Sequence, residues 1–227
     1  MIVASRSGIV VRTGRRGVHP GCMSIRSRHA QHPPCVSHSR ADTRWLLAGY
    51  AGLAGFFALE AFTRQPGSAS SMDTSSDDQG TTRIIVIAYA LATDLPLLLR
   101  RLPVLQLPPV AGPIGLTVQA SGLALRAWSM RTLGASYTRT LRTDAEQRVV
   151  TTGPYRWVRH PGYTGSLLIW TGFAVTSRSM PVIGVVVGLL GRVYQRRVRA
   201  EEQLLHRELP GYTAYCQHTK TLVPLIW

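Results

Sequence analysis

Long apolar runs separated by short polar and arginine-rich stretches dominate the pattern of the chain. The runs cover residues 45–62, 84–99, 114–130 and 163–176, and a last one continues from 182 into a helical pattern that reaches about 208. Runs that approach about 18–20 residues with almost no charge favour burial in lipid, because a helix of that length crosses the bilayer core of roughly 30 Å. We therefore predict an all-α fold, a polytopic membrane helical bundle of about five spans.

The last two runs predict a C-terminal helical hairpin. The break "TSRSMP" at 176–181 separates a short first arm from a second arm that carries charged residues at its far end. That second arm, about 40 Å long as a helix, outruns the membrane and projects its charged end into water. The hairpin consequently brings the segment before its first arm and the segment after its second arm to one membrane face.

The polar stretches divide the chain into three predicted regions. Residues 1–43 carry no acidic residue before Asp42 and lack the apolar core of a secretory signal, so we predict a disordered basic tail. Residues 44–114 hold the N-terminal membrane spans and a polar linker, and residues 115–227 form a C-terminal domain that contains the hairpin.

Charge and cysteine content change this picture little. The formal net charge of +15 would suit nucleic acid. Many arginines instead lie at the ends of apolar runs, where they anchor to the interface and to lipid headgroups; these are Arg44, Arg83, Arg100, Arg101, Arg131 and Arg192. We therefore expect membrane lipids and not nucleic acid as partners. The cysteines, Cys22, Cys35 and Cys216, have no metal-ligand spacing, so no metal site is predicted.

Candidate chemistry lies at the two ends of the hairpin. "GPYRWVRHPGYTG" precedes the first arm and "RVYQRRVRAEEQLL" ends the second. Pro161 keeps His160 out of a helix and suits a first helical turn, whose free amides attract an anionic group. Gly165 would let a ligand approach the backbone closely. The hairpin would gather one polar cluster made of Arg159, His160, Tyr163, Arg199, Glu201 and Glu202.

Glu201 and Glu202 allow two interpretations. Adjacent helical residues point about 100° apart, so one of the two should face inward, where a carboxylate suits a ligand that carries an ammonium or sulfonium group. Alternatively, both lie on the helix surface, with Arg197 paired to Glu201 and Arg199 to Glu202, each pair stabilising the helix by only about 0.2–0.5 kcal/mol.

These motifs, with "LPGYTAYCQHTKTLVPLIW" and "SGLALRAWSMRTLGASYTRTL", resemble the isoprenylcysteine carboxyl methyltransferase family, related to the membrane phospholipid methyltransferases, over about residues 115–227. The resemblance implies S-adenosylmethionine in a cytosolic cofactor pocket of an integral membrane protein, with the plasma membrane as the expected location. It implies that the cofactor is bound by His160, Pro161, Tyr163, Gly165, Glu201 and Glu202. It assigns catalysis, with placement of an anionic substrate group, to Arg159, Tyr163 and Arg199.

The implied reaction is methyl transfer to a lipophilic small-molecule or prenylated substrate, with a carboxylate as the preferred nucleophile because it is already ionised at neutral pH. Two alternatives stay open. A membrane sterol reductase that uses NADPH has a similar hairpin motif, although neighbouring carboxylates would repel its 2′-phosphate. A non-catalytic membrane protein would have no pocket between 159–163 and 199–202. The sequence leaves the oligomeric state open.

Overall fold

The structure, a computed structural model, describes residues 40–63, 80–99, 105–134 and 149–222. The chain divides into two compact units, residues 1–35 and 36–227, and every described residue belongs to the second. The predicted tail at 1–43 lies almost entirely outside the described residues. The described helices are α1 (Arg40–Phe62), α2 (Thr81–Leu99), α3 (Ala111–Leu133), the short 3-10 helix η3 (Gly153–Arg156), α4 (Pro161–Thr176), α5 (Met180–Glu208) and α6 (Tyr212–His218).

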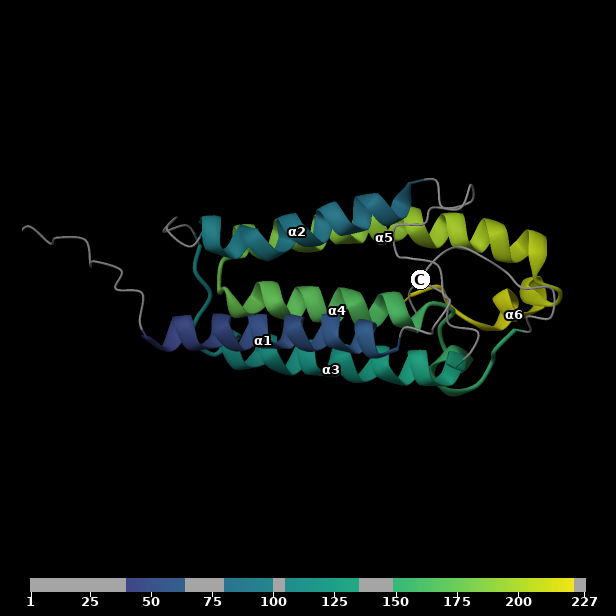
Figure 1. The fold of residues 1–227 in the computed structure, drawn as a ribbon, viewed down its shortest axis with the longest axis horizontal. Helices are drawn as coiled ribbons and strands as arrows, with labels where there is room; N and C mark the ends of the chain where they lie inside the picture. Colours follow the sequence, from purple (N-terminus) through teal and green to yellow (C-terminus); the bar gives the residue numbers. More distant parts are fainter. Residues whose placement is uncertain (1–39, 64–79, 100–104, 135–148, 223–227) are drawn as a thin grey trace, which may run out of the picture. The chain divides into compact units, whose positions relative to one another are not determined.

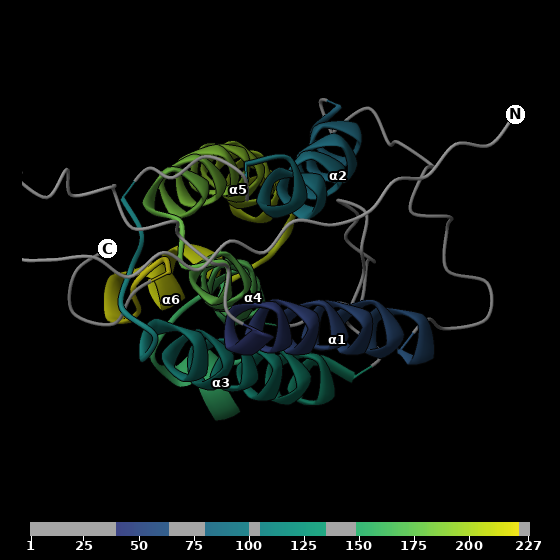
Figure 2. The ribbon, with the colours of Figure 1, turned by 90° about the vertical axis from the view of Figure 1, so that its left-hand side faces the viewer.

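The five long helices of the second unit form two layers. Helices α1, α3 and α4 make one layer, and α2 pairs with α5 in the other (Figures 1 and 2). Helix α4 is central because it packs against α1, α3 and α5. Large side chains of α4 fill this centre, where Ile169, Trp170 and Phe173 are fully buried. The prediction of an all-helical bundle is confirmed for the described residues.

Glycines let α3 and α4 approach closely. A Cβ atom at Gly122 would lie only 2.7 Å from the carbonyl oxygen of Gly165, and one at Gly165 would lie 3.0 Å from the backbone nitrogen of Arg126. Small residues at such contacts favour tight helix packing in membranes. Gly165 therefore packs against a neighbouring helix, and its contact with a ligand stays a prediction.

The outer faces of α1 and α2 are largely apolar. Exposed residues include Leu47 and Phe57 on α1 and Ile87, Leu91 and Leu98 on α2. Helices α1 and α2 are each long and apolar enough to cross a membrane. An apolar exterior of this extent is unusual for a soluble monomer and suits contact with lipid. In contrast, α4 has only 16 residues, and the second half of α5 is charged. Packing against neighbouring helices therefore holds these two helices in the bundle.

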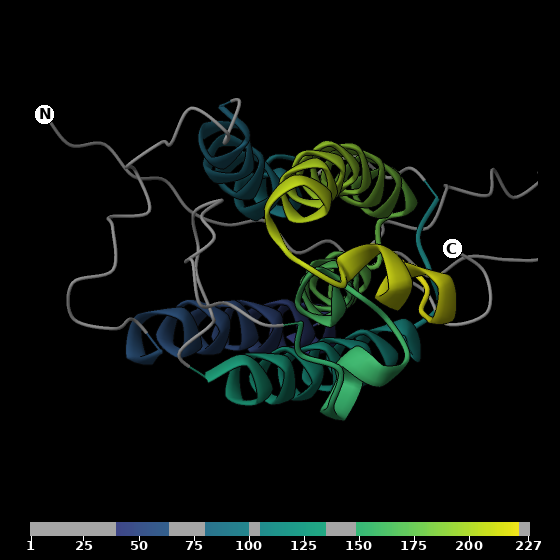
Figure 3. The same ribbon diagram turned by 90° about the vertical axis from the view of Figure 1, so that its right-hand side faces the viewer.

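The predicted hairpin is confirmed, and the C-terminal segment closes over its open end. Helices α4 and α5 pack side by side after a tight turn in which Arg178 has φ 58°. Helix α6 then folds back toward the start of α4 (Figure 3). The amide nitrogens of Arg159 and His160 donate to the carbonyl oxygens of Lys220, at 2.8 Å, and Thr221, at 3.1 Å. This pairing fixes the lip of α4 against the segment that follows α6.

Candidate functional site

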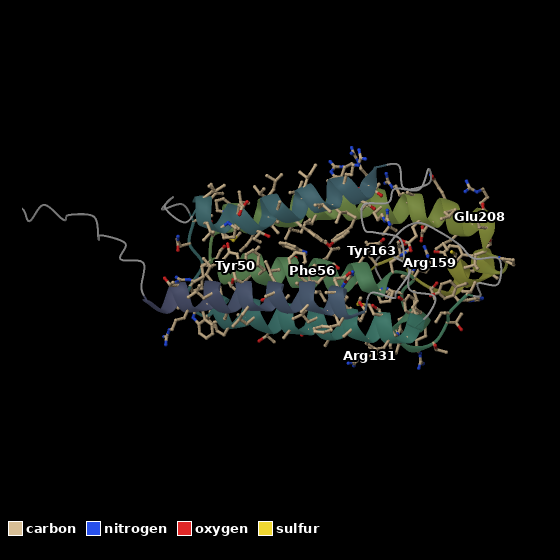
Figure 4. The ribbon with its side chains drawn as sticks, in the orientation of Figure 1. Tyr50, Phe56, Arg131, Arg159, Tyr163 and Glu208 are labelled. Atoms are coloured by element: carbon tan, nitrogen blue, oxygen red, sulfur yellow. The ribbon has the colours of Figure 1, made fainter. Side chains whose placement is uncertain are left out.

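A cavity of about 310 Å³ opens between the two layers near the start of α4. Its walls come from α1, α2, α3, α4, α5 and the segment before α4. Of the residues predicted from sequence, the cavity is lined by Arg159, His160, Tyr163 and Glu201. Figure 4 shows Tyr163 and Arg159 at this end of the bundle, with Phe56 deeper between the layers. The predicted convergence of the two hairpin ends is thus confirmed.

Tyr163 joins the two arms of the hairpin. Its hydroxyl donates to Oε2 of Glu201 at 2.8 Å and accepts from Nε of Arg197 at 3.2 Å. The Glu201 side chain is 28% exposed, and Nδ1 of His160 lies 4.0 Å from its Oε1. Glu201 therefore places a partly desolvated carboxylate at the cavity wall, within a fixed set of polar neighbours.

Glu202, the next residue of α5, contacts Arg159 and the other ring nitrogen of His160. Its Oε1 accepts from Nε of Arg159 at 2.8 Å and lies 3.3 Å from Nε2 of His160. Arg159 also donates to the carbonyl oxygen of Thr219 at 2.5 Å and to Oγ1 of Thr221 at 2.8 Å. Arg159 and Glu202 consequently tie the lip of α4 to α5 and to the C-terminal segment.

The electrostatics of this ion pair favour its charged form. Burial by itself would raise the pKa of Glu202, but hydrogen bonds from His160 and Arg159, and then their charges, lower that pKa to about 2. Burial alone would lower the pKa of Arg159, yet its hydrogen bond to Glu202 and the Glu202 charge raise it overall. Both groups are therefore ionised throughout the physiological pH range.

We expect Glu202 to contribute an acid-sensitive part of the stability. Its pKa is about 2 in the folded protein and 4.5 without the fold. This contribution is complete above pH 4.5 and is lost as the pH falls through about 2, amounting to about 1–2 kcal/mol after allowance for partial exposure. Thermal unfolding of the wild type and Glu202→Gln between pH 6 and about pH 2.5 checks this. The difference between the two proteins should shrink with acid, and a constant difference would contradict it.

Arg199 is a predicted site residue that does not line the cavity. It is exposed, and it lines a separate surface hollow on the outer side of α5. Arg197, two residues earlier and therefore about 200° around the helix, is buried and lines the cavity instead. The surface pair of Arg199 with Glu202 does not form, because Glu202 binds Arg159. We therefore correct the expected position of Arg199.

Pro161 begins α4 as expected and is buried in the fold. Like Gly165 and Glu202, it is not part of the cavity wall. Pro161 and Glu202 thus shape the site from behind: Pro161 fixes the first turn of α4, and Glu202 holds Arg159 and His160 in place.

Sequence reasoning missed an ion pair in the cavity wall. Nε of Arg126 on α3 donates to Oε1 of Glu60 on α1 at 2.6 Å. Nη1 of Arg126 donates to the carbonyl oxygen of Gly162 at 2.8 Å and to Oγ of Ser166 at 2.6 Å. One arginine thereby connects three helices. The signal was present, since each of these charges interrupts an apolar run, and ionisable residues inside membrane helices usually have a buried partner.

Two tyrosines were also missed. The hydroxyls of Tyr89 on α2 and Tyr194 on α5 lie 2.6 Å apart, and the ring of Tyr89 stacks on that of Trp170 with 4.7 Å between centroids. Both tyrosines line the cavity. Nothing in the linear pattern distinguishes them from interfacial tyrosines, because their meeting depends on how α2 packs against α5.

Comparison with known proteins gives the class to which this fold and site are similar. Residues 114–207 match the model of the isoprenylcysteine carboxyl methyltransferase (ICMT) family. The chain has the fold of a solved protein described as the eukaryotic intramembrane Ras methyltransferase ICMT. The TM-score is 0.59 at 21% identity, over 83% of this chain and 69% of that one. The predicted resemblance and the predicted all-helical fold are both confirmed.

Relatives named as enzymes and relatives named otherwise share this region. The chain is 33% identical over 118 residues to a probable protein-S-isoprenylcysteine O-methyltransferase of Oryza sativa, covering 50% of this chain and 61% of that protein. It is 28% identical over 116 residues to the cobalt-zinc-cadmium resistance protein CzcN of Cupriavidus metallidurans, covering 49% of this chain and 50% of that protein. The chain thus spans less than two thirds of either relative.

Proposed function

We propose that this protein is an integral membrane methyltransferase that transfers a methyl group from S-adenosylmethionine to the carboxylate of a lipophilic, isoprenylcysteine-type substrate. The observation that carries the proposal is the cavity in which Glu201 meets Tyr163 at 2.8 Å beside an apolar wall. We further propose the plasma membrane as its location and the cytosolic side as the face on which the cavity opens. The family match over residues 114–207 supports the reaction class.

The polar end of the cavity fits the cofactor. S-adenosylmethionine carries an ammonium group and a sulfonium group, and it supplies an electrophilic methyl group whose bonding electron pair stays on sulfur when the methyl leaves. Glu201 offers the carboxylate that a cationic group requires, while Tyr163 and His160 hold that carboxylate in place. A fixed anion in a partly desolvated site attracts a cation more strongly than one in water does.

The apolar end fits a lipid chain. Phe56 and Phe57 of α1 and Ile85 and Val86 of α2 supply apolar side chains to the cavity wall. Val86 and Phe57 are also exposed on the outer surface of the bundle. The same residues therefore border both the cavity and the surrounding lipid, which suits a substrate that arrives from the membrane.

Arg197 suits the role in substrate placement that the resemblance implies for Arg199. It is buried, lines the cavity and donates to the hydroxyl of Tyr163 at 3.2 Å. We propose that Arg197 positions the substrate carboxylate, whose oxygen bonds to the methyl carbon as the carbon–sulfur bond breaks. No proton moves, because a carboxylate with a pKa of about 3.5 is already ionised at neutral pH. Alignment and exclusion of water are then the main contributions of the protein.

The test uses the full chain purified in detergent. We expect S-adenosylmethionine, and not NADPH, to raise its melting temperature. With methyl-tritiated S-adenosylmethionine and N-acetyl-S-farnesylcysteine, we expect label in the organic phase that mild base releases as methanol, which marks a methyl ester. Label that appears only in added phosphatidylethanolamine and resists base would refute the carboxylate substrate. Stabilisation by NADPH alone would refute methyl transfer and support the reductase.

A further inference from the structure

The outward face of α5 changes character along its length. Val185 and Leu189 lie on the same stripe as Arg192, Arg196 and Arg199, because successive members are three or four residues apart. Val185 is 50% exposed, and all three arginines are exposed. The stripe therefore runs from a lipid-compatible half to a strongly basic half at the end of the bundle that holds the cavity.

The arginines border a hollow that apolar residues also line. The hollow lies between α5 and the beginning of α2, and it is lined by Ile84, Leu189, Arg192, Val193, Gln195, Arg196 and Arg199. The first residue of α2 lies beside this part of α5, since Oγ1 of Thr81 accepts a hydrogen bond from Nη1 of Arg197 at 2.8 Å. Basic and apolar groups thus line one depression at the point where the apolar part of α5 ends. We call this depression the basic hollow.

The positive charge of the basic hollow is not neutralised by the described part of the chain. Among the described residues, the three arginines make no side-chain ion pair or hydrogen bond. The neighbouring acidic residues of α5 are turned away: Glu201 accepts from Tyr163, Glu202 pairs with Arg159, and Glu208 pairs with Arg207. The hollow is also separate from the catalytic cavity, because the two share no lining residue.

We propose that the basic hollow binds one anionic phospholipid from the surrounding membrane. The guanidinium groups of Arg192, Arg196 and Arg199 hold the headgroup phosphate, for which arginine has well-matched donors. The first part of an acyl chain lies on Leu189, Val193 and Ile84. Basic pockets between membrane helices are suited to such headgroups, and each basic side chain near the surface contributes about 1 kcal/mol to attraction of anionic lipid. Free phosphate would lack the apolar contacts.

Native mass spectrometry of the full chain in detergent tests the proposal. Dioleoylphosphatidylglycerol and dioleoylphosphatidylcholine, which differ in headgroup charge, are titrated separately. We expect the anionic lipid to bind about 10-fold more tightly or better. Because each arginine contacts the headgroup, Arg196→Gln/Arg199→Gln should weaken binding of the anionic lipid about 10-fold. The affinity for phosphatidylcholine should stay unchanged. Arg196→Lys/Arg199→Lys, which keeps the charge, should retain most of the affinity.

The matched control is Arg44→Gln/Arg131→Gln, which removes the same charge from exposed positions on α1 and α3. This control should change the affinity by no more than about twofold. Equal losses in the two glutamine variants would overturn the proposal, since the effect would then be general attraction. Equal binding of the two lipids would overturn it as well. Complete displacement of the anionic lipid by about 10 mM inorganic phosphate would show a free-anion site instead.

Discussion

Arg126→Met is expected to destabilise the protein by about 3–5 kcal/mol, because it leaves Glu60 as a buried charge without its partner. The same change removes the donors to the carbonyl oxygen of Gly162 and to Ser166, which fix the first turn of α4. We therefore expect the melting temperature to fall by about 10 °C. Static light scattering, or size-exclusion chromatography after heating, measures this change. The methyl transfer that we propose should fall with it, since Gly162 and Ser166 line the cavity.

Arg131 provides the matched control for Arg126. It lies on the same helix but is exposed, and Figure 4 shows it on the outer side of α3. Arg131→Met should change stability by less than about 0.5 kcal/mol. The double variant Glu60→Gln/Arg126→Met removes both buried charges and should recover at least half of the loss. Equal effects of the two single methionine variants, or no recovery in the double variant, would show that the ion pair is unimportant.

The fold was largely predictable from the sequence, because the length of an apolar run indicates a membrane helix. The apolar run at 163–176 agrees closely with helix α4 at Pro161–Thr176. Pro161 limits this helix at its start, and the polar break at 176–181 limits it at its end. The pairing of layers was not predictable. Contacts such as that between Tyr89 and Tyr194 join residues 105 positions apart, and no local pattern encodes them.

The site shows the same division. The meeting of Tyr163 with Glu201 could be predicted because a hairpin forces its two ends together. The position of Arg199 was predicted wrongly because the sequence does not show which side of α5 faces the cavity. Several arginines lie within a few residues of one another, and only the packing shows that Arg197 faces inward. Arg126 and Glu60 were accessible in principle. Each is a charge within an apolar run, and the requirement for a buried partner would have connected them.

We expect Glu201→Gln to weaken binding of S-adenosylmethionine about 10- to 100-fold, because it removes the carboxylate that we propose to face the cofactor's cationic end. Glutamine can still accept the hydrogen bond of Tyr163, so the fold should persist. Isothermal titration with the detergent-purified chain measures the affinity. Glu208→Gln makes the same change of charge at an exposed position of α5, and it should leave the affinity unchanged within about twofold.

A comparison with S-adenosylhomocysteine tests which cationic group of the cofactor lies at Glu201 in the proposed complex. S-adenosylhomocysteine keeps the ammonium group of S-adenosylmethionine but has a neutral sulfur. We place the ammonium at Glu201, because the methyl-bearing sulfur must face the apolar side of the cavity where Phe56 and Ile85 lie. Glu201→Gln should therefore weaken the two ligands by the same factor. A loss confined to S-adenosylmethionine would put the sulfonium beside Glu201 and reverse the orientation of the cofactor. Unchanged affinity for both would remove Glu201 from the binding site.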